Sequence, residues 1–554
     1  MRRVAMLTAA IALVAAANAG AANRVRFPFP QEDGSLTPYT FRLGYPLVTL
    51  VYDTLTWRDA RGVPQPWLAR SIRRGPDGRT LTIRLRDGVR WHDGRPLTAA
   101  DVAFTYRYVR RHPHPRFTPQ VRNVASVRVR ARGLDTVVMR LRRPSLGVLD
   151  QPLADVPILP RHLWADLPPG RDAPPGLPVG SGPFRLVEHE RDRRYTFAAN
   201  RSYFMGRPTV DRLEVPIVGR ADRMAQGLRE GRYDAITAGP GADSLRSPTV
   251  AVASGPSYVG TVLMLNLRAP PFDRPEARRA LAQAIDVTRL TRAVTGAVPG
   301  SSVSPADRGY LSPDSRWAAA EPVRRADPDA ARLTFAEQGV GAITVLAPTS
   351  NPIAREAGRQ AVIELQGAGA LARLRVVAPE HLAHAVGQDG SRPTFQAAIW
   401  PAPALASYDP AFLRPLFSSG GELNYPGYAS RAFDRAMDRA ADATTEGDRR
   451  TAFDAALRRL DADGPVLPLL YAPAEFAYRP GVFDGWVFVR GSGILDKRSF
   501  LPHTATARGR PVAAQRSPVD PVTEDRSLLP YVAGGLGLVA LLAAAVLVTR
   551  RRRR

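Results

Sequence analysis

The sequence of 554 residues contains no cysteine and a single lysine, Lys497. Without cysteine the chain can form no disulfide, no zinc–thiolate site and no thiol nucleophile. It also cannot carry a lipid on an N-terminal cysteine, and its fold must rest on burial of the core. Arginine supplies nearly all of the positive charge, and the formal net charge at pH 7 is +26.

Common catalytic motifs are also missing. The sequence has no Gly-x-Ser-x-Gly elbow, no His-Glu-x-x-His and no Gly-x-x-x-x-Gly-Lys phosphate loop. We therefore predict no enzyme, no cofactor and no metal site. His381 and His384 follow Glu380 and could share a helix face as metal ligands, but a solvated helix surface is the favoured interpretation.

The arginines are scattered along the chain, and no module of basic and aromatic residues recurs. Nucleic-acid binding is therefore not expected. A basic surface drawn to an anionic membrane or cell wall is the simpler interpretation of the charge.

Both ends of the chain carry apolar runs. Residues 1–19 begin with two arginines and end in Ala17-Asn18-Ala19, which is the pattern of a signal peptide. Residues 528–549 form an uncharged run long enough to cross the ~30 Å hydrocarbon core of a bilayer. Five arginines follow at 550–554, and the positive-inside bias keeps such a tail in the cytoplasm. We therefore expect a single-pass protein of the cell membrane with an extracytoplasmic ectodomain.

Between the ends, a strand and a helix are predicted within residues 80–109. Residues 80–86 alternate with period two, which indicates a strand with one buried face. Thr98 and Asp101 have the spacing of a capping box and predict the start of a helix. The side chains expected to be buried are Leu81, Ile83 and Leu85 on the strand and Val102, Tyr106 and Val109 on the helix.

Later stretches combine turns with buried elements. Two glycines and two prolines surround Ser181 and predict a rigid loop before a strand at 184–187. A buried strand is predicted at 262–266, after which Asp273 is expected to cap a helix with Pro275 in its first turn. A helical pair around 433–460 precedes a core strand at 466–471.

These stretches resemble the extracellular solute-binding proteins of family 5, whose members bind peptides, nickel chelates, haem and some sugars for ABC importers. The resemblance is carried most specifically by residues 85–102, LRDGVRWHDGRPLTAADV, and by the loop Gly180-Ser181-Gly182-Pro183. Residues 200–208 and 265–286 match in the family's order, and looser matches occur at 228–236 and 430–470. The resemblance covers about residues 30–500.

The resemblance implies an α/β, two-lobed periplasmic-binding-protein-like fold of type II, with the extra inserted domain, ahead of a C-terminal transmembrane helix. The implied boundaries are 24–48, 180–258 and 470–500 for a discontinuous lobe I, 49–179 for the inserted domain II and 259–469 for lobe III. Residues 501–527 are rich in Pro, Ala and Arg and are expected to form a disordered linker to the membrane span.

One departure from the family bears on the ligand. Peptide-binding members place an aspartate shortly after a tryptophan, where it pairs with the peptide's ammonium group. Here Trp400 is followed by proline at the expected position, Pro403, and the nearest acid is Asp409. An ammonium group in a dehydrated cleft needs a counter-charge. Either Asp409 supplies it through a shifted loop, or the ligand has no free amine, which is the interpretation we favour.

Aromatic residues are the other ligand candidates, because a cleft for varied solutes needs flat apolar surfaces and a few polar anchors. By their position in the family, the candidate ligand-binding residues are Tyr39, Tyr52, Trp400, Tyr408 and Asp409.

The sequence thus predicts a monomeric, membrane-anchored substrate-binding protein that delivers a peptide or peptide-like solute to the permease of an ABC importer. The alternative is a membrane-tethered ligand sensor or surface-interaction protein that retains the fold without an importer.

Overall fold

The computed structural model describes residues 23–41, 44–130, 135–167, 172–239 and 241–502. Chain contacts divide the protein into a unit of residues 1–512 and a second unit of residues 513–554, which lies outside the described ranges. The predicted signal peptide, the membrane span, the arginine tail and all but the first two residues of the predicted linker also lie outside them. Within the described ranges, no helix is both long enough and apolar enough to span a bilayer.

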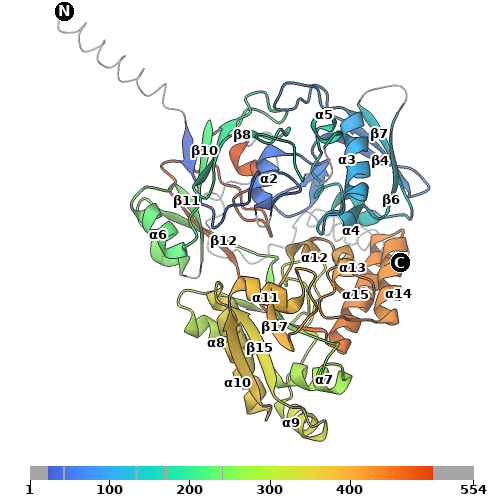
Figure 1. The fold of residues 1–554 in the computed structure, drawn as a ribbon, viewed down its shortest axis with the longest axis vertical. Coiled ribbons are helices and arrows are strands. Elements are labelled where there is room, and N and C mark those ends of the chain that lie inside the picture. Colours follow the sequence, from blue (N-terminus) through green and yellow to red (C-terminus); the bar gives the residue numbers. More distant parts are fainter. Residues whose placement is uncertain (1–22, 42–43, 131–134, 168–171, 240, 503–554) are drawn as a thin grey trace, which may run out of the picture. The chain divides into compact units, whose positions relative to one another are not determined.

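Lobe I, as the name is used below, is built from three separate parts of the chain (Figure 1). Its first sheet has the order β1-β10-β9-β8, in which the N-terminal β1 pairs in parallel with β10. Its second sheet has the order β11-β19-β12, so that the late strand β19 lies between two earlier ones. The bounds are β1 Arg24–Arg26, α2 Tyr45–Val51, β8 Phe184–Glu190, β9 Arg194–Ala199, β10 Arg212–Pro216, α6 Ala221–Arg229, β11 Ala235–Ala238, η2 Ala242–Leu245, β12 Ala251–Gly255, β19 Ala474–Tyr478 and η4 Lys497–Phe500.

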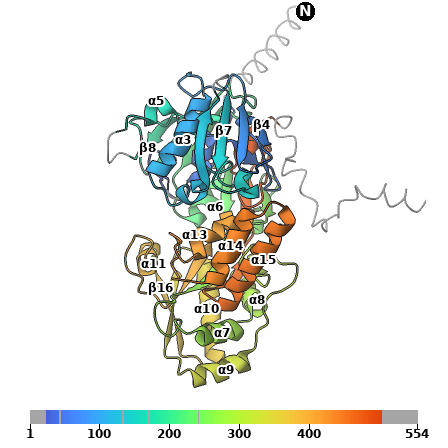
Figure 2. The same cartoon turned by 90° about the vertical axis from the view of Figure 1, so that its right-hand side faces the viewer.

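Domain II is an antiparallel sheet of order β4-β5-β7-β6 with helix α3 lying across it (Figure 2). The predicted strand and its buried face are confirmed, and so is the capping box, since the Thr98 backbone N–H donates to Asp101 Oδ2 at 2.8 Å. Asp101 Oδ1 also accepts from the N–H of Arg161, which fastens the short helix α5 to α3. The bounds are β2 Thr56–Arg58, β3 Pro64–Pro66, β4 Ala69–Arg74, β5 Thr80–Leu85, α3 Ala99–Arg111, α4 Thr118–Val121, β6 Val124–Val129, β7 Thr136–Leu141, η1 Leu146–Leu149 and α5 Arg161–Trp164.

Lobe III has a six-stranded mixed sheet of order β14-β18-β13-β17-β15-β16. The strands predicted at 262–266 and 466–471 are β13 and β18, which pair antiparallel at the centre of the sheet. The bounds are β13 Gly260–Leu265, β14 Ser304–Pro305, β15 Ile343–Pro348, β16 Ala372–Val377, β17 Ala397–Ala402 and β18 Val466–Tyr471, with helices α7 Pro275–Ala284, α8 Val287–Ala297, α9 Pro328–Glu337, α10 Pro352–Gly367, α11 Pro379–Val386, α12 Ala404–Tyr408, η3 Pro410–Phe412, α13 Leu413–Phe417, α14 Arg431–Asp442 and α15 Glu446–Asp463.

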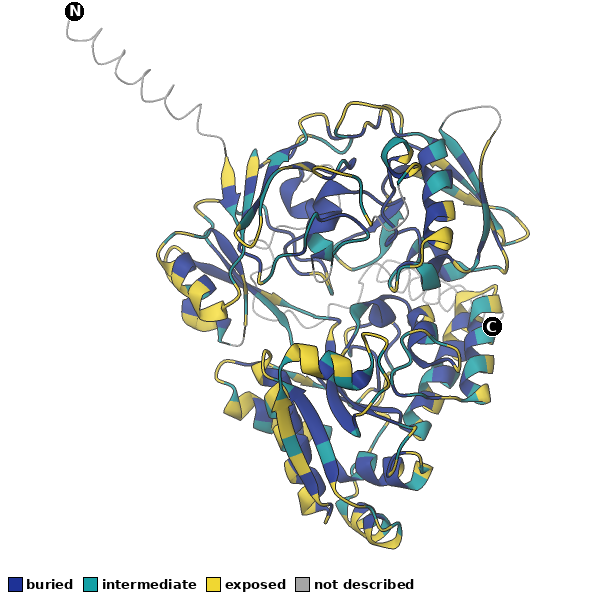
Figure 3. Ribbon diagram, viewed as in Figure 1, coloured by how far each residue is buried: buried dark blue, intermediate teal, exposed yellow. Residues whose placement is uncertain are grey.

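The helices of lobe III bury one face each. On α10 the buried positions recur every three to four residues against the sheet, and the opposite face is exposed (Figure 3). The predicted apolar face of α7 is confirmed, but its predicted cap is wrong. The N-cap is Arg274 rather than Asp273, and it makes no side-chain capping bond. Pro275 occupies the first turn, where its missing N–H costs no helical bond, and Asp273 lies one residue before the N-cap position.

A buried aspartate joins lobe I to domain II. Asp53 follows α2 and its carboxylate accepts hydrogen bonds from four side chains that are distant in sequence. These donors are Trp67 Nε1 at 3.0 Å, Ser181 Oγ at 3.0 Å, Tyr203 Oη at 2.9 Å and Lys497 Nζ at 2.6 Å. The hydroxyl of the Gly-Ser-Gly-Pro loop and the tyrosine of residues 200–208 therefore meet at one carboxylate. Both partners of the Lys497–Asp53 pair are fully buried.

The glycines of the same loop are needed for its approach to α2. A Cβ atom at Gly180 would lie 1.9 Å from the Val51 carbonyl oxygen, and one at Gly182 would lie 2.3 Å from that of Leu50. No side chain fits at either position. The loop can bring Ser181 to Asp53 only because glycine stands on both sides of it.

Removing Lys497 should destabilise the junction between lobe I and domain II. A Lys497→Met variant leaves Asp53 buried without its counter-charge, and we expect the free energy of unfolding to fall by about 3–5 kcal/mol. Urea denaturation of both proteins measures the change. The matched control is Arg70→Ala, which breaks the exposed Arg70–Asp87 pair of domain II and should cost less than about 1 kcal/mol. Similar losses of unfolding free energy in the two variants would show that the Lys497–Asp53 pair does not stabilise the junction.

Candidate functional site

A cavity of about 590 Å³ lies where lobe I, domain II and lobe III meet. Aromatic rings line it from both sides. Phe41, Tyr45 and Trp57 come from the N-terminal part of the chain, and Tyr408 and Phe412 come from lobe III. A partly polar, largely aromatic cavity between lobes is the usual form of a small-molecule site.

Tyr45 is held rigidly at one wall. It opens helix α2, its hydroxyl donates to the carbonyl oxygen of Asp155, and the guanidinium of Arg116 lies 4.0 Å from its ring centre. Arg116 in turn donates to both carboxylate oxygens of Asp155, at 2.9 and 2.6 Å. The charge of this arginine is therefore matched within the wall itself.

Arg58 is the last residue of β2 and the second arginine of the cavity lining. Its guanidinium stacks on the ring of Tyr408, 4.2 Å from the ring centre, and Nη2 donates to the carbonyl oxygen of Asp150 at 3.0 Å. The side chain is 9% exposed, and its Nε has no hydrogen-bond partner within the described residues. The nearest carboxylate, that of Asp150, is 3.9 Å from Nε.

Tyr408 forms the opposite face of this stack. Its hydroxyl donates to the Arg490 carbonyl oxygen and lies 2.9 Å from Ser492 Oγ, and its ring meets that of Tyr258 edge-on. Burial raises the pKa of Tyr408 to about 12, so the phenol stays neutral. The ring therefore offers an apolar surface rather than a charge.

Asp409 does not face the cavity. It is fully buried and its carboxylate oxygens accept from Arg449 Nη2 at 2.6 and 2.7 Å, while the N–H of Ala411 donates to one of them. Gly147 of domain II covers this pair so closely that a Cβ there would lie 2.1 Å from the Asp409 carboxylate. The charge of Asp409 is thus matched inside lobe III and sealed by domain II.

Asp150 lies between these groups. Burial, and then repulsion from Asp409, raise its pKa to about 7, although Arg58, Arg316 and Arg449 act in the opposite direction. Near neutral pH a substantial fraction of the molecules therefore carries a proton at this position. This site has an excess of arginine over ionised carboxylate.

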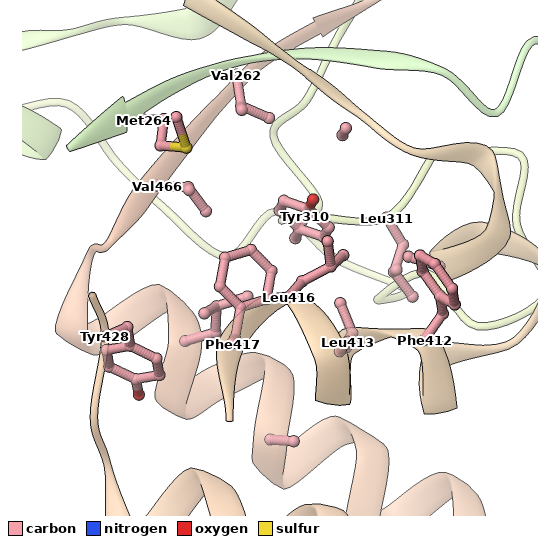
Figure 4. Close-up of a cluster of buried hydrophobic side chains, with 14 of the residues drawn as sticks. Val262, Met264, Tyr310, Leu311, Phe412, Leu413, Leu416, Phe417, Tyr428 and Val466 are labelled. Carbon is pink, nitrogen blue, oxygen red and sulfur yellow. The ribbon is translucent and has the colours of Figure 1, made fainter. Parts of the chain in front are cut away.

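A second cavity of about 230 Å³ lies inside lobe III next to the first, since Pro403 and Leu423 line both. The described residues that line it include no Asp, Glu, Lys, Arg or His. Trp400 and Tyr425 meet edge-on there, 5.9 Å apart between ring centres. Six apolar side chains of its lining, seen in Figure 4, are Val262, Met264, Tyr310, Leu416, Phe417 and Val466.

The five predicted site residues thus take different positions. Tyr408 lines the larger cavity and Trp400 the smaller one. Tyr39 packs against Tyr108 and Trp164 of domain II. Tyr52 is 1% exposed in the core of lobe I, and Asp409 is paired with Arg449 as described. Trp400 and Tyr408 thus line neighbouring cavities that share Pro403, and Tyr39, Tyr52 and Asp409 are not among the described lining residues of either.

Sequence reasoning missed Arg58, Trp57, Tyr45 and Phe412. The dipeptide Trp57-Arg58 directly after a buried stretch was the one available signal, because a lone arginine beside aromatic residues can mark an anion site. The possible metal ligands His381 and His384 are exposed on α11, and His384 is bonded to Asp389 at 2.8 Å. His92, by contrast, is half-buried, and desolvation lowers its pKa to about 4.

Comparison with known proteins identifies the same architecture. The model of the bacterial extracellular solute-binding proteins, family 5 middle region, matches residues 63–424. The "Probable di/tripeptide-binding protein 5" of Pseudomonas aeruginosa is 26% identical over 451 residues, which are 75% of this chain and 83% of that protein. A Brucella ovis protein named as a candidate ABC transporter peptide-binding protein is 30% identical over 250 residues, 44% of this chain. That match spans 47% of the Brucella protein, about half its length.

A solved structure agrees with the fold. The oligopeptide-binding protein AppA of Bacillus subtilis, in complex with a nonapeptide, is 19% identical and superposes with a TM-score of 0.74. The superposition covers 86% of this chain and 99% of AppA. The mixed α/β, two-lobed periplasmic-binding-protein fold predicted from the sequence is therefore confirmed.

The proton on Asp150 should make stability depend on pH. Its folded pKa of about 7 lies above the ordinary value near 4, so the stabilisation is complete below about pH 4 and is lost as the pH rises to about 7. Asp150→Asn mimics the protonated form at every pH. Unfolding free energies measured between pH 5 and 8 should fall more steeply for the parent protein than for this variant. Parallel slopes would show that Asp150 ionises normally.

Proposed function

Since the chain belongs to the bacterial extracellular solute-binding proteins of family 5, we propose that it captures a peptide-like solute outside the cytoplasm and delivers it to the permease of an ABC importer. One observation supports this most directly. Aromatic side chains from lobe III face those of the N-terminal part across the 590 Å³ cavity. Such a cavity encloses a solute of peptide size without any catalytic group having to act on it.

Contacts around the cavity already join domain II to lobe III. Gln151 Nε2 donates to the carbonyl oxygen of Leu405, and Arg122 of domain II pairs with Glu422 of lobe III. Hinge motion that makes and breaks such contacts is the usual way in which these proteins enclose a ligand, and an importer can distinguish the two states. The importer function is preferred to a tethered sensor because the relatives from Brucella and Pseudomonas are named for transport or peptide binding.

The cargo is a solute without a free ammonium group. Of the two readings left open by the sequence, a shifted loop that presents Asp409 to the ligand is disfavoured, because Arg449 already neutralises this carboxylate within lobe III. Pro403, where an acid was expected, lines both cavities and offers no charge. An ammonium group there would lose its hydration without a partner.

The boundaries of the three parts follow the secondary structure. Helix α2 packs in the core of lobe I and strand β18 belongs to the sheet of lobe III. We therefore place the start of domain II after Tyr52 rather than at residue 49, and the end of lobe III at Tyr471 rather than at residue 469.

The apolar run at 528–549 is proposed as the membrane anchor, with residues 1–19 as the signal peptide. The protein with residues 528–554 deleted should appear in the soluble extracytoplasmic fraction, whereas the full chain should sediment with membranes and resist extraction at alkaline pH. Immunoblots of the fractions decide this. Release of the full chain by carbonate alone would rule out an integral anchor.

Ligand binding should raise the melting temperature of the protein. A panel of free-amine peptides, the same peptides N-acetylated, metal chelates and oligosaccharides is screened by thermal shift. A ligand at a hundred times its Kd adds about 2.7 kcal/mol to the folded state, which a melting curve detects. We expect acetylated peptides to be preferred. A preference for free amines would refute the cargo assignment, and a panel without any shift would refute the receptor function.

A further inference from the structure

We propose that the cargo is an acidic, amphipathic solute whose anionic group binds Arg58 and whose uncharged arm passes Pro403 and Leu423 into the second cavity. This inference rests on the proposed function, since it takes the 590 Å³ cavity as the cargo site. The ligand class is a carboxylate on an apolar body with its amine blocked, such as an N-acylated amino acid or dipeptide.

Arg58 is a buried arginine whose guanidinium has a donor without a hydrogen-bond partner among the described residues. Its side chain is 9% exposed, yet Nε donates to no described atom and only Nη2 has a bond, to a backbone carbonyl. Nε itself is covered by protein atoms, so the proposed anion would contact the guanidinium on its side toward the cavity, where no described carboxylate is hydrogen-bonded to it. The planar fork of an arginine matches a carboxylate with two parallel bonds. The stack on Tyr408 holds this fork in place at the cavity wall.

The other arginines nearby are already matched. Arg116 also lines the cavity, but it makes two hydrogen bonds to Asp155. Arg449 is held by Asp409 behind Gly147 and is not part of this lining. Arg58 is therefore the cation of the described cavity lining that lacks a hydrogen-bonded carboxylate. Its closest one, Asp150, is 3.9 Å away.

The local charge balance points the same way. Four buried side chains, Arg58, Arg449, Asp150 and Asp409, lie together here. Because burial and Asp409 raise the pKa of Asp150 to about 7, this group is often neutral at physiological pH, and the cluster then carries one excess positive charge. An anion beside Arg58 restores neutrality, whereas a cation would add to the imbalance.

The second cavity defines the other end of the ligand. Trp400 and Tyr425 form its aromatic wall, and Gln388 supplies a side-chain amide. Because charged residues are missing from this lining, a charged end group would be desolvated there without compensation. Because Pro403 and Leu423 line both cavities, the two lie next to each other, and the proposed ligand would extend past these side chains from one into the other.

Among the described residues of the larger cavity lining, Asp496 is the one acid and could instead attract an ammonium group. It is 2% exposed, and its Oδ1 already accepts from Trp57 Nε1 and from the backbone N–H of Arg498. Burial raises its pKa, although Arg498 and Lys497 oppose the shift. These features make Asp496 a structural carboxylate, and they favour the anionic ligand.

Three matched ligands test the proposal on the full-length protein by isothermal titration. They are N-acetyl-Leu-Phe, which has a carboxylate, its C-terminal carboxamide, which is neutral, and Leu-Phe-amide, which has only an ammonium group. We expect the acid to bind about tenfold to a hundredfold more tightly than the carboxamide, as a charge-assisted hydrogen bond supplies. We expect the amine to bind weakest.

The wild-type selectivity decides the question even if variants at Arg58 fold poorly. Equal affinities for acid and carboxamide, or tightest binding of the amine, would overturn the proposal. So would failure of all three ligands while the wider panel finds another cargo, and in that case the receptor function stands. If the panel also finds nothing, the receptor function falls as well.

Variants then locate the anion. Arg58→Gln should cost about tenfold to a hundredfold in affinity for N-acetyl-Leu-Phe and leave affinity for the carboxamide unchanged. Arg58→Lys should recover part of the loss because it keeps the charge but not the fork. The control is Arg61→Gln, an exposed arginine from the turn after the same strand. Equal weakening of both ligands by Arg58→Gln, or a similar effect of Arg61→Gln, would contradict the assignment.

Discussion

The ion pair between Lys497 and Asp53 is the contact on which the arrangement of lobe I and domain II depends. It joins residues 444 positions apart, both fully buried, and the same carboxylate also accepts bonds from Trp67, Ser181 and Tyr203. An isolated buried charge would cost several kcal/mol, so none of these segments can shift without exposing the others' polar atoms. The walls of the cavity at Tyr45, Trp57 and Arg58 lie within a few residues of this carboxylate. The positions of these cavity walls therefore depend on Asp53, a buried residue outside the proposed ligand site.

The sequence predicted those features that depend on neighbours along the chain. The alternation at 80–86 became β5, and the spacing of Thr98 and Asp101 became a capping box, because both patterns are decided within one or two turns of backbone. Asp273 failed as a cap because the helix begins one residue later, with Arg274 at the N-cap and Pro275 in the first turn. Asp409 does start a helix, as an Asp-Pro element is expected to, but its pairing with Arg449 could not be predicted, since that partner lies 40 residues downstream and the cover, Gly147, lies in another domain. Pairing across such separations depends on tertiary packing and leaves no local pattern.

In the proposed site, the ligand would be selected by the charges that the cleft leaves unmatched. The carboxylates of Asp155 and Asp409 are each paired with an arginine of the protein. The pKa of Asp150 is raised well above its ordinary value. What remains is a guanidinium on an aromatic ring and a neutral extension beside Trp400. Replacing the family's expected acid by Pro403 removes a positive ligand's partner without leaving an unpaired group behind. Selectivity of this kind depends on the protein charges that are already paired within the protein as much as on the unpaired charge offered to the ligand.

The burial of the only lysine has a practical consequence for chemical labelling. In the folded protein the Lys497 amine is out of reach of acylating reagents, and the chain has no thiol. Slow acylation of Lys497 would therefore report how often the junction of lobe I and domain II opens, because the amine becomes reactive only then. An introduced pair of cysteines would likewise be the only thiols in the chain, so fluorophores could be placed on the two sides of the cavity without background. The absence of cysteine, which denies the fold any disulfide, thus makes its motions easy to follow by site-specific labelling.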